Sequence, residues 1–268
     1  MDEQRDYSNK IKIIMPEEKN LRTFGICIAD KNVEITCFYK QTVDMCKNYL
    51  AHFDIPDVCV KITKEDIITE RENSKRITLP ELGIYNNKVA LTVDYSHIEP
   101  IIVYRKIVEA LLEQNIILIH GAAIMVDKYC YIFTAPSGVG KTTHINNWKK
   151  CFPDTIVING DKPLVNMIDK MVYGTPWCGK EAMNTNTSAL LSGIIVLERG
   201  KTNCLYPISF SQMLPTLLQQ CYIPKSLELY LKAYQLIGNF RNIPCYRLIC
   251  NMEKEAAIVA FNALMEQR

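Results

Sequence analysis

Residues 129–143 read YCYIFTAPSGVGKTT, an apolar run that leads through two glycines into a lysine and two threonines. The apolar residues 129–134 are typical of a strand, and the stretch that follows the threonines is compatible with a helix through Trp148. The segment between them matches the phosphate-binding pattern G-x-x-x-x-G-K-[ST] at every position except the first, where Ala135 replaces glycine. The strand, the loop and the helix together predict a phosphate-binding loop at residues 135–143.

Each part of this loop has a physical reason to hold a nucleoside triphosphate. Its glycines let the backbone approach phosphate oxygens without a Cβ in the way, and successive N–H groups can then point at the phosphate. The N-terminus of the following helix adds a favourable potential for an anion. We expect Lys141 to reach the β and γ phosphates and the hydroxyl of Thr142 to coordinate Mg²⁺. The expected ligands are therefore Mg²⁺ and ATP, or another nucleoside triphosphate, held by Ser137, Gly138, Val139, Gly140, Lys141, Thr142 and Thr143.

Asp161 is the first acidic residue to follow the next apolar strand, in the segment TIVINGD. Its short distance along the chain from Thr142 suggests that the strand paired next to the loop delivers it. A carboxylate there can accept the proton of a substrate hydroxyl as the phosphoryl group arrives, or it can hold magnesium. The alternative interpretation is a turn aspartate that precedes Pro163.

Two further side chains are candidates for a catalytic role. His120 ends an apolar run before a glycine, so we expect it at the rim of the site, where it orients Asp161 or touches phosphate; the alternative is a structural histidine. Lys180, in the segment GTPWCGKE, is a candidate to offset the charge that spreads over the transferred phosphoryl oxygens, and the alternative is a solvated surface lysine. His144 and Trp177 are expected to be packing residues.

The blocks HGAAIMVDKYCYIFTAPSGVGKTTHINNW and VINGDKPLV resemble the catalytic domain of HPr kinase/phosphorylase and its relatives, which share a core with ATP-dependent phosphoenolpyruvate carboxykinases. The resemblance covers about residues 100–265, and its specificity lies in residues 120–180. It implies a phosphate-loop domain with a mixed, partly antiparallel sheet that transfers a phosphoryl group from ATP. Smaller members of this group stand beside peptide-maturation genes, and some phosphorylate a serine of a precursor peptide. The expected acceptor is therefore a hydroxyl, on a serine-containing peptide or protein.

The chain departs from the family at two points. Members often carry two adjacent aspartates, whereas this chain has Gly160 before Asp161, so one carboxylate performs both functions or another residue, such as Glu181, supplies the second. The chain also lacks the C-terminal signature segment of true HPr kinases, so HPr itself is not the expected acceptor. Two alternative functions stay open: a kinase of a small metabolite such as free serine, and a nucleotide-binding accessory protein without catalysis.

The hydrophobic pattern predicts two parts, a small N-terminal α/β domain at residues 1–98 and the phosphate-loop domain at residues 99–268. In the first part we expect a helix at 42–53, a turn at 30–32 and strands at 24–29, 33–39, 58–62, 77–79 and 88–93. In the second part we expect strands at 116–125, 129–134, 155–159, 164–168, 193–198 and 246–250, and helices at 102–114, 209–221, 225–237 and 253–266. Asn251 is expected to cap the last of these helices.

The composition excludes several classes of protein. Lys+Arg is 31 and Asp+Glu is 29, a formal net charge of +2, which argues against a nucleic-acid partner or a strongly charged membrane binder. No apolar run approaches the roughly 20 residues that span a bilayer, and the N-terminus does not look like an export signal, so we expect a cytoplasmic protein. Homo-oligomerisation stays open. The 11 cysteines form no C-x-x-C pair and sit mostly among apolar residues, which favours reduced core thiols over a zinc site or a disulfide framework.

Overall fold

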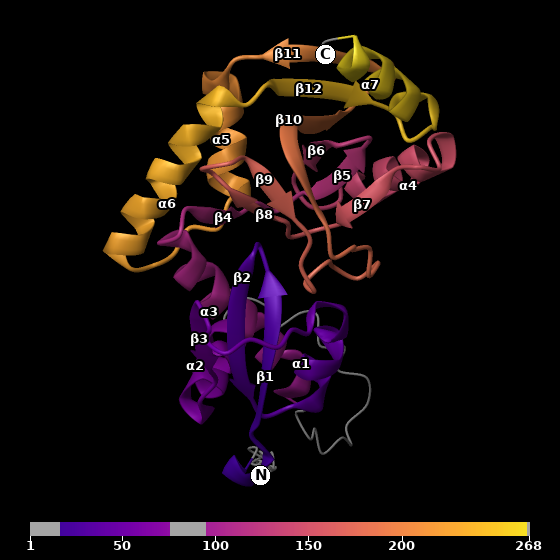
Figure 1. Ribbon diagram of the computed structural model, residues 1–268. Helices are drawn as coiled ribbons and strands as arrows, with labels where there is room; N and C mark the ends of the chain where they lie inside the picture. The colour runs from indigo at the N-terminus through magenta and orange to yellow at the C-terminus, as the bar shows by residue number, and fades with distance from the viewer. Residues whose placement is uncertain (1–16, 76–94, 267–268) are drawn as a thin grey trace, which may run out of the picture.

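The computed structural model describes residues 17–75 and 95–266 as a mixed α/β protein with two β-sheets (Figure 1). The smaller sheet has three strands in the order β1-β2-β3 and is formed by the first part of the chain. The larger sheet has nine strands and carries both parallel and antiparallel pairs, so it is mixed, as expected. The strands expected at 77–79 and 88–93 lie outside the described residues.

The smaller sheet begins with an antiparallel hairpin in which Ile28 pairs with Lys31. Ala29 and Asp30 have φ angles of 52° and 56°, as a two-residue hairpin turn of type I′ requires at both positions. The turn expected at 30–32 therefore begins one residue earlier. The third strand pairs with the second in parallel. The bounds are Arg22–Ile28 for β1, Lys31–Cys37 for β2 and Val58–Lys61 for β3.

The helices around the smaller sheet differ from the expectation. The helix predicted over 42–53 is wrong, because α1 covers only Lys40–Met45 and is followed by a single 3₁₀ turn at Lys47–Tyr49. A second helix, α2 at Lys64–Lys75, was not expected, because its composition is largely polar and gives little apolar periodicity. The buried carboxylate of Glu99 accepts hydrogen bonds from the main-chain N–H of Phe38 and of Tyr39 at 2.7 and 3.0 Å, which anchors the entry to α1.

The larger sheet has the order β4-β8-β9-β10-β6-β5-β7, and β12 and β11 extend it beside β10. Strand β10 is long enough to pair with β6 on one side and, on the other side, with β9 through its first residues and with β12 through its last ones. The strands β6, β10 and β12 run parallel to one another. The bounds are Ile116–Leu118 (β4), Ala122–Val126 (β5), Tyr129–Thr134 (β6), Ile156–Asn159 (β7), Leu164–Asn166 (β8), Met171–Tyr173 (β9), Ser188–Arg199 (β10), Cys204–Ile208 (β11) and Cys245–Cys250 (β12).

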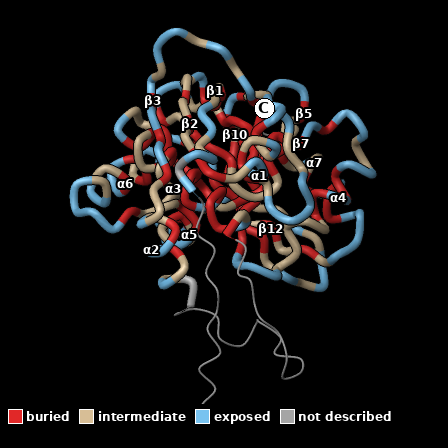
Figure 2. The backbone as a smooth tube through the Cα atoms, turned by 90° about the horizontal axis from the view of Figure 1, so that it is seen from below, coloured by how far each residue is buried: buried red, intermediate tan, exposed pale blue. Residues whose placement is uncertain are grey.

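Helices cover both faces of this sheet (Figure 1). Side chains alternate between the faces of a strand, and in β6 Cys130 and Ile132 belong to the core under α5 and α6, whereas Tyr131 and Phe133 belong to the core under α4 and α7. Figure 2 shows the buried segments of the chain running through the middle of the molecule. The bounds are Lys141–Cys151 for α4, Phe210–Gln220 for α5, Leu227–Asn239 for α6 and Glu255–Met265 for α7.

Most expected elements of this part are confirmed within a few residues, with three corrections. The run expected at 116–125 is two strands, because the chain turns at His120 and the halves join different neighbours, β8 and β6. The strands β9 and β11 were not expected. Asn251 is not the cap of α7: Lys254 stands at that position, and the side chain of Asn251 instead accepts a hydrogen bond from the N–H of Glu253 at 3.1 Å.

Helix α3 at Glu99–Leu112 joins the two sheets, since its buried residues share one apolar cluster with strands of both. Two hydrogen bonds also connect the first part of the chain directly to the part that forms the larger sheet. The hydroxyl of Tyr173 donates to Asp30 at 2.7 Å, and the amide of Asn184 donates to the hydroxyl of Tyr49 at 3.2 Å. The boundary expected after residue 98 thus falls at the start of a helix that packs against both sheets, and the division into two domains stays a prediction.

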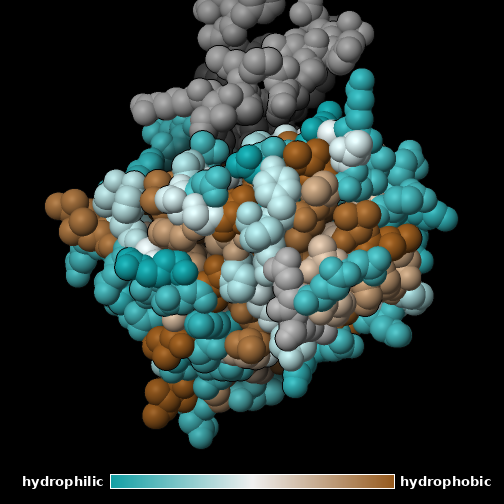
Figure 3. All heavy atoms as spheres, turned by 90° about the horizontal axis from the view of Figure 1, so that it is seen from above, coloured by the Kyte–Doolittle hydropathy of each residue, from teal (hydrophilic) through white to brown (hydrophobic). Residues whose placement is uncertain are grey.

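The surface carries both apolar and hydrophilic side chains. Figure 3 shows apolar side chains scattered among hydrophilic ones on the face seen from above. In the described ranges no helix has both the length and the apolar character that crossing a membrane requires.

The 11 cysteines carry free thiols, and six are buried: Cys37, Cys46, Cys130, Cys221, Cys245 and Cys250. Burial raises the pKa of Cys46 to about 12, so this thiol stays protonated at neutral pH.

Candidate functional site

The predicted phosphate loop connects the end of β6 to the start of α4. Gly138 and Gly140 have φ angles of +80° and +120°, which glycine adopts at little cost, and Gly140 stands at the N-cap of α4. A Cβ added at Gly138 would meet no atom within 4 Å, so the space over this part of the loop is open. Ala135 is buried and is not among the described residues with a positive φ, which explains why alanine is accepted where the pattern has glycine.

Lys141 extends back over the loop, where its ammonium group donates to the carbonyl of Ala135 at 2.7 Å. Burial lowers the pKa of Lys141, while the nearby carboxylate of Asp161 raises it. The lysine therefore stands as a partly desolvated donor at the point where a polyphosphate would lie against the loop. Lys141 also lines the open space over the loop, so its ammonium group is accessible to an anion bound there.

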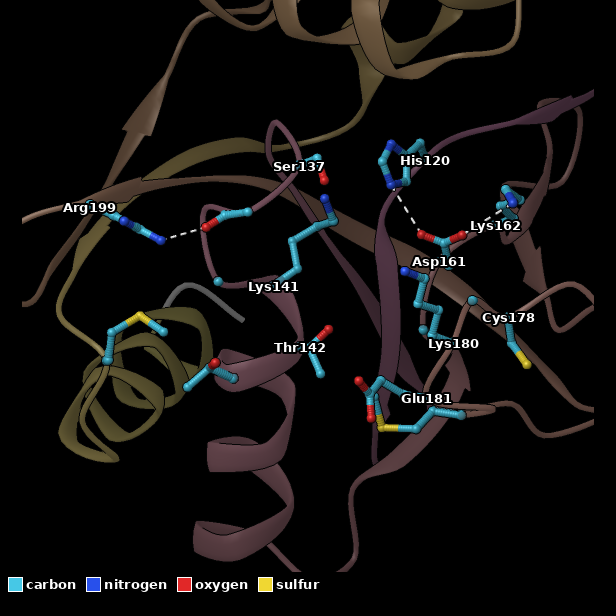
Figure 4. Close-up of a pocket in the computed structure, with 17 residues that line it drawn as sticks. His120, Ser137, Lys141, Thr142, Asp161, Lys162, Cys178, Lys180, Glu181 and Arg199 are labelled. Atoms are coloured by element: carbon cyan, nitrogen blue, oxygen red, sulfur yellow. Dashed lines mark hydrogen bonds and ion pairs between the residues drawn. The ribbon is translucent and has the colours of Figure 1, made fainter. Parts of the chain in front are cut away.

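A cavity of about 640 Å³ opens over the loop (Figure 4). This volume falls in the range of small-molecule sites, roughly 300–1,000 Å³. All of the predicted site residues line it except Val139, whose side chain packs against the core under α4 and α7. Val139 can therefore contribute only its main chain to the site. The predicted residues on the wall are His120, Ser137, Gly138, Gly140, Lys141, Thr142, Thr143, Asp161 and Lys180.

Asp161 reaches this cavity from a different strand than expected. It follows β7, and β7 pairs with β5 rather than with β6, so the expectation that the strand next to the loop delivers it is wrong. Strand β5 is antiparallel to both β6 and β7, so β6 and β7 run parallel and end at the same edge of the sheet. The loop after β6 and the aspartate after β7 therefore meet even though β5 lies between their strands.

Asn159 fixes the turn that carries Asp161, and sequence reasoning did not identify it. Its side-chain oxygen accepts the N–H groups of Asp161 and Lys162 at 2.8 and 2.7 Å, while its amide group donates to the carbonyl of Thr175 at 3.1 Å. Asn159 is fully buried. The available signal was the triplet Asn-Gly-Asp, since an asparagine often accepts from the main chain two residues later.

Two basic side chains hold the carboxylate of Asp161. The Nε2 atom of His120 lies 3.1 Å from Oδ1, and the Nζ atom of Lys162 lies 3.3 Å from Oδ2. Burial raises the pKa of Asp161, but the hydrogen bond from His120 and the charge of Lys162 outweigh this effect, so the pKa lies below its usual range. Asp161 is therefore ionised at neutral pH. The structure brings His120 and Asp161 together, as expected for a histidine that orients the aspartate.

The turn at residues 178–181 passes close to Asp161. Gly179 has a φ angle of +78°, and a Cβ added there would lie 3.1 Å from the Cβ of Asp161. Lys180 and Glu181 follow in this turn; both are exposed and line the cavity. Figure 4 shows them on the same side of Lys141 and Thr142 as Asp161. A basic and an acidic side chain are thus available near the carboxylate.

Helix α3 supports this part of the site from behind. The ring of Trp177 stacks on Tyr104 with centroids 4.3 Å apart, and its indole N–H donates to the carbonyl of Pro100 at 2.8 Å. The hydroxyl of Tyr104 donates to the carbonyl of Lys162 at 2.7 Å. Trp177 is 6% exposed, so its expected role in packing is confirmed.

His144 is also a packing residue, as expected. It is buried, and its Nε2 atom accepts the indole N–H of Trp148 at 2.8 Å. Burial lowers its pKa to about 4, so the ring is neutral at pH 7 and forms part of the aromatic core of α4.

Arg199 is a wall residue that sequence reasoning missed. It ends β10, the neighbour of the loop strand, and its Nε atom donates to the carbonyl of Val139 at 3.2 Å. Its Nη2 atom donates to the carbonyl of Gly138 (Figure 4). The one available signal was a basic residue at the end of an apolar strand. Arg199 thus holds the loop from the side opposite to Asp161.

Compared with known proteins, the chain matches no family model and no curated protein. The chemistry of the site must therefore be inferred from its own residues. In the described part of the chain, no group of three or more His, Cys, Asp or Glu side chains is arranged to hold a metal ion. The arrangement combines loop amides and a lysine that suit a polyphosphate with an ionised carboxylate that suits removal of a proton. It can hold a phosphate chain on one side and activate a hydroxyl on the other.

Proposed function

We propose that this protein is a Mg²⁺-dependent kinase that transfers the γ-phosphoryl group of ATP to a hydroxyl, on a serine of a peptide or protein. The observation that supports the proposal most is the position of Asp161 relative to the loop. Asp161 and its partner His120 lie across one cavity from Lys141 and Thr142. Phosphoryl transfer requires these two elements, a cradle for the phosphates and a base beside the incoming hydroxyl.

In this proposal the loop and the start of α4 bind the nucleotide. The main-chain N–H groups of residues 137–140 and the ammonium of Lys141 hold the phosphates, and Thr143 lies next to them on the wall. Thr142 supplies a hydroxyl ligand for Mg²⁺, and Asp161 is the candidate for a further contact. When bound, Mg²⁺ neutralises charge on the phosphate oxygens.

Asp161 acts as the general base. The acceptor oxygen forms a bond to the γ phosphorus, the bond to the β–γ bridging oxygen breaks, and the acceptor proton passes to Asp161. We assign this proton to Oδ2, because its ion pair with Lys162 at 3.3 Å is longer than the contact of Oδ1 with His120. Lys180 then offsets charge on the transferred group.

The single aspartate has a structural explanation. A Cβ added at Gly160 would lie 3.3 Å from the Cβ of Met183, so a second carboxylate at this position requires Met183 to shift. Asp161 and Glu181 are the acidic side chains of the described cavity wall. Glu181 is therefore our candidate to supply the second carboxylate.

We propose an HPr-kinase-like phosphate-loop domain over residues 99–268, preceded by a small α/β domain, in a cytoplasmic protein. The support is a strand, loop and helix followed by a strand that ends near an aspartate at the same sheet edge, within a mixed sheet.

The test is a transfer assay with the purified protein, Mg²⁺ and ATP. Serine-containing peptides, beginning with products of neighbouring genes, are compared with free serine, and products are identified by mass spectrometry. A phosphoserine peptide supports the proposal. Phosphorylation of free serine with no peptide product favours the small-metabolite kinase. Nucleotide binding without turnover on any acceptor favours the non-catalytic accessory protein.

A further inference from the structure

The cavity continues past the loop on the side away from Asp161. The order of the strands in the sheet shows which elements lie on this side. Strands β10 and β12 lie on one side of the loop strand β6, whereas β7, which leads to Asp161, lies on the other. Arg199 ends β10, and its register partner in β12 is Cys250, two residues before Met252. Arg199 and Met252 therefore line the cavity opposite to the carboxylate, as Figure 4 shows for Arg199.

The main chain around Met252 is fixed from two directions. The side-chain amide of Asn147, in α4, donates to the carbonyl of Met252 at 3.0 Å. The N–H of Asn251 donates to the side chain of Asn203, in the connection between β10 and β11, at 2.9 Å. Met252 is thus held in place at its backbone, although it lies in the connection between β12 and α7.

The side chain of Met252, by contrast, is open to the cavity. It is 46% exposed, and it lies against the start of α4, where a Cβ added at Gly140 would be 3.0 Å from its sulfur. Most of the residues around the cavity are polar or charged. An exposed thioether on a fixed backbone is suited to contact a flat apolar ligand group, because sulfur interacts favourably with aromatic rings.

The direction of phosphoryl transfer decides which part of a bound nucleotide lies beside Met252. The attacking and leaving oxygens are roughly in line with the transferred phosphorus, so the terminal phosphate must face the base, Asp161. The rest of the phosphate chain runs back over the loop, and the nucleoside leaves on the opposite side. We propose that Met252, beside Arg199, forms the apolar wall of a nucleoside subsite that contacts the aromatic base. This inference rests on the proposed function.

The test compares a nucleotide with a phosphate chain that has no base. Affinities for ATP and for inorganic tripolyphosphate are measured by calorimetry with Mg²⁺ for the wild type and for Met252→Ala. The matched control is Ile258→Ala, which removes a side chain of similar exposure (39%) on α7 outside the cavity wall. We expect Met252→Ala to weaken ATP binding about tenfold and to leave tripolyphosphate binding nearly unchanged. The control should change neither.

The outcomes separate this inference from the proposed function. Equal weakening of both ligands in Met252→Ala overturns the nucleoside subsite, because Met252 then acts only through the loop at Gly140. Unchanged ATP binding in this variant overturns it as well. Met252→Leu, which keeps apolar bulk and the fold, should retain most of the affinity for ATP. A wild type that binds neither ligand contradicts the proposed function itself.

Discussion

The Nε2 atom of His120 lies 3.1 Å from the Oδ1 atom of Asp161, although the two residues follow different strands, β4 and β7. A main-chain hydrogen bond of 3.0 Å from Gly121 to the carbonyl of Asp161 ties the same two segments together. The orientation of the carboxylate is therefore set by the fold itself. A base that is oriented in advance loses little freedom when its substrate arrives.

Removing His120 should change the pH dependence of turnover. The hydrogen bond from His120 lowers the pKa of Asp161, so His120→Ala should raise that pKa, and activity should be lost at a higher pH as the solution is acidified. The stability that the ionised carboxylate contributes is present above its unfolded pKa and is lost as pH falls through the folded pKa. A pH–rate profile measures the shift, with exposed His52→Ala as the control. An unchanged acid limb in His120→Ala would contradict the assigned contact.

Lys141→Ala should abolish turnover and weaken binding of ATP with Mg²⁺ by about a hundredfold, because it removes a charge placed over the phosphates. The control is Lys149→Ala, which removes an exposed lysine from the last turn of the same helix. Calorimetry of both variants provides the measurement. Affinity like that of the wild type in Lys141→Ala would refute the assignment of the phosphate loop.

Arg199 should act through its geometry as well as its charge. Its two donors bond to the carbonyls of Val139 and Gly138, and a lysine cannot present both in this arrangement. We expect both Arg199→Lys and Arg199→Ala to raise hydrogen exchange in the loop and to weaken nucleotide binding. Restoration of both properties by lysine would show that only the charge matters.

Tyr104→Phe should lower the free energy of unfolding by about 1 kcal/mol, because it removes one partly buried hydrogen bond to Lys162 and keeps the stack on Trp177. Tyr104→Ala also removes the stack and should cost about 3–5 kcal/mol. Denaturant unfolding measures both values. Equal losses in the two variants would show that the ring stack contributes nothing beyond the hydroxyl.

The local part of the site could be predicted from the sequence. The loop depends on the glycine spacing and on Lys141, which lie close together in the chain, and Asp161 follows directly on its apolar strand. The pairing of strands is not local, so the position of β5 between β6 and β7 left no signal in the sequence.

The same reason explains the residues that were missed. Arg199 and Met252 come together because β10 pairs with β12, far along the chain, with Ile194 opposite Cys245. Helix α2 has too few apolar residues to show a face, and β9 has only three residues, so neither could be found by periodicity. Asn159 was missed despite the triplet Asn-Gly-Asp, because its side chain binds the main chain of the turn rather than a ligand.

We claim that Asp161 accepts the proton of the acceptor, and Asp161→Asn decides whether it does, because the variant keeps the size of the side chain and removes its basicity. Nucleotide affinity is measured by titration, and transfer to a serine-containing acceptor by mass spectrometry. We predict a fall in transfer rate of about 10²–10⁴-fold with a much smaller loss of affinity, since Lys141, Thr142 and the loop amides remain. A joint fall in affinity for ATP with Mg²⁺ would assign Asp161 to the metal instead. Transfer at the wild-type rate would contradict the claim.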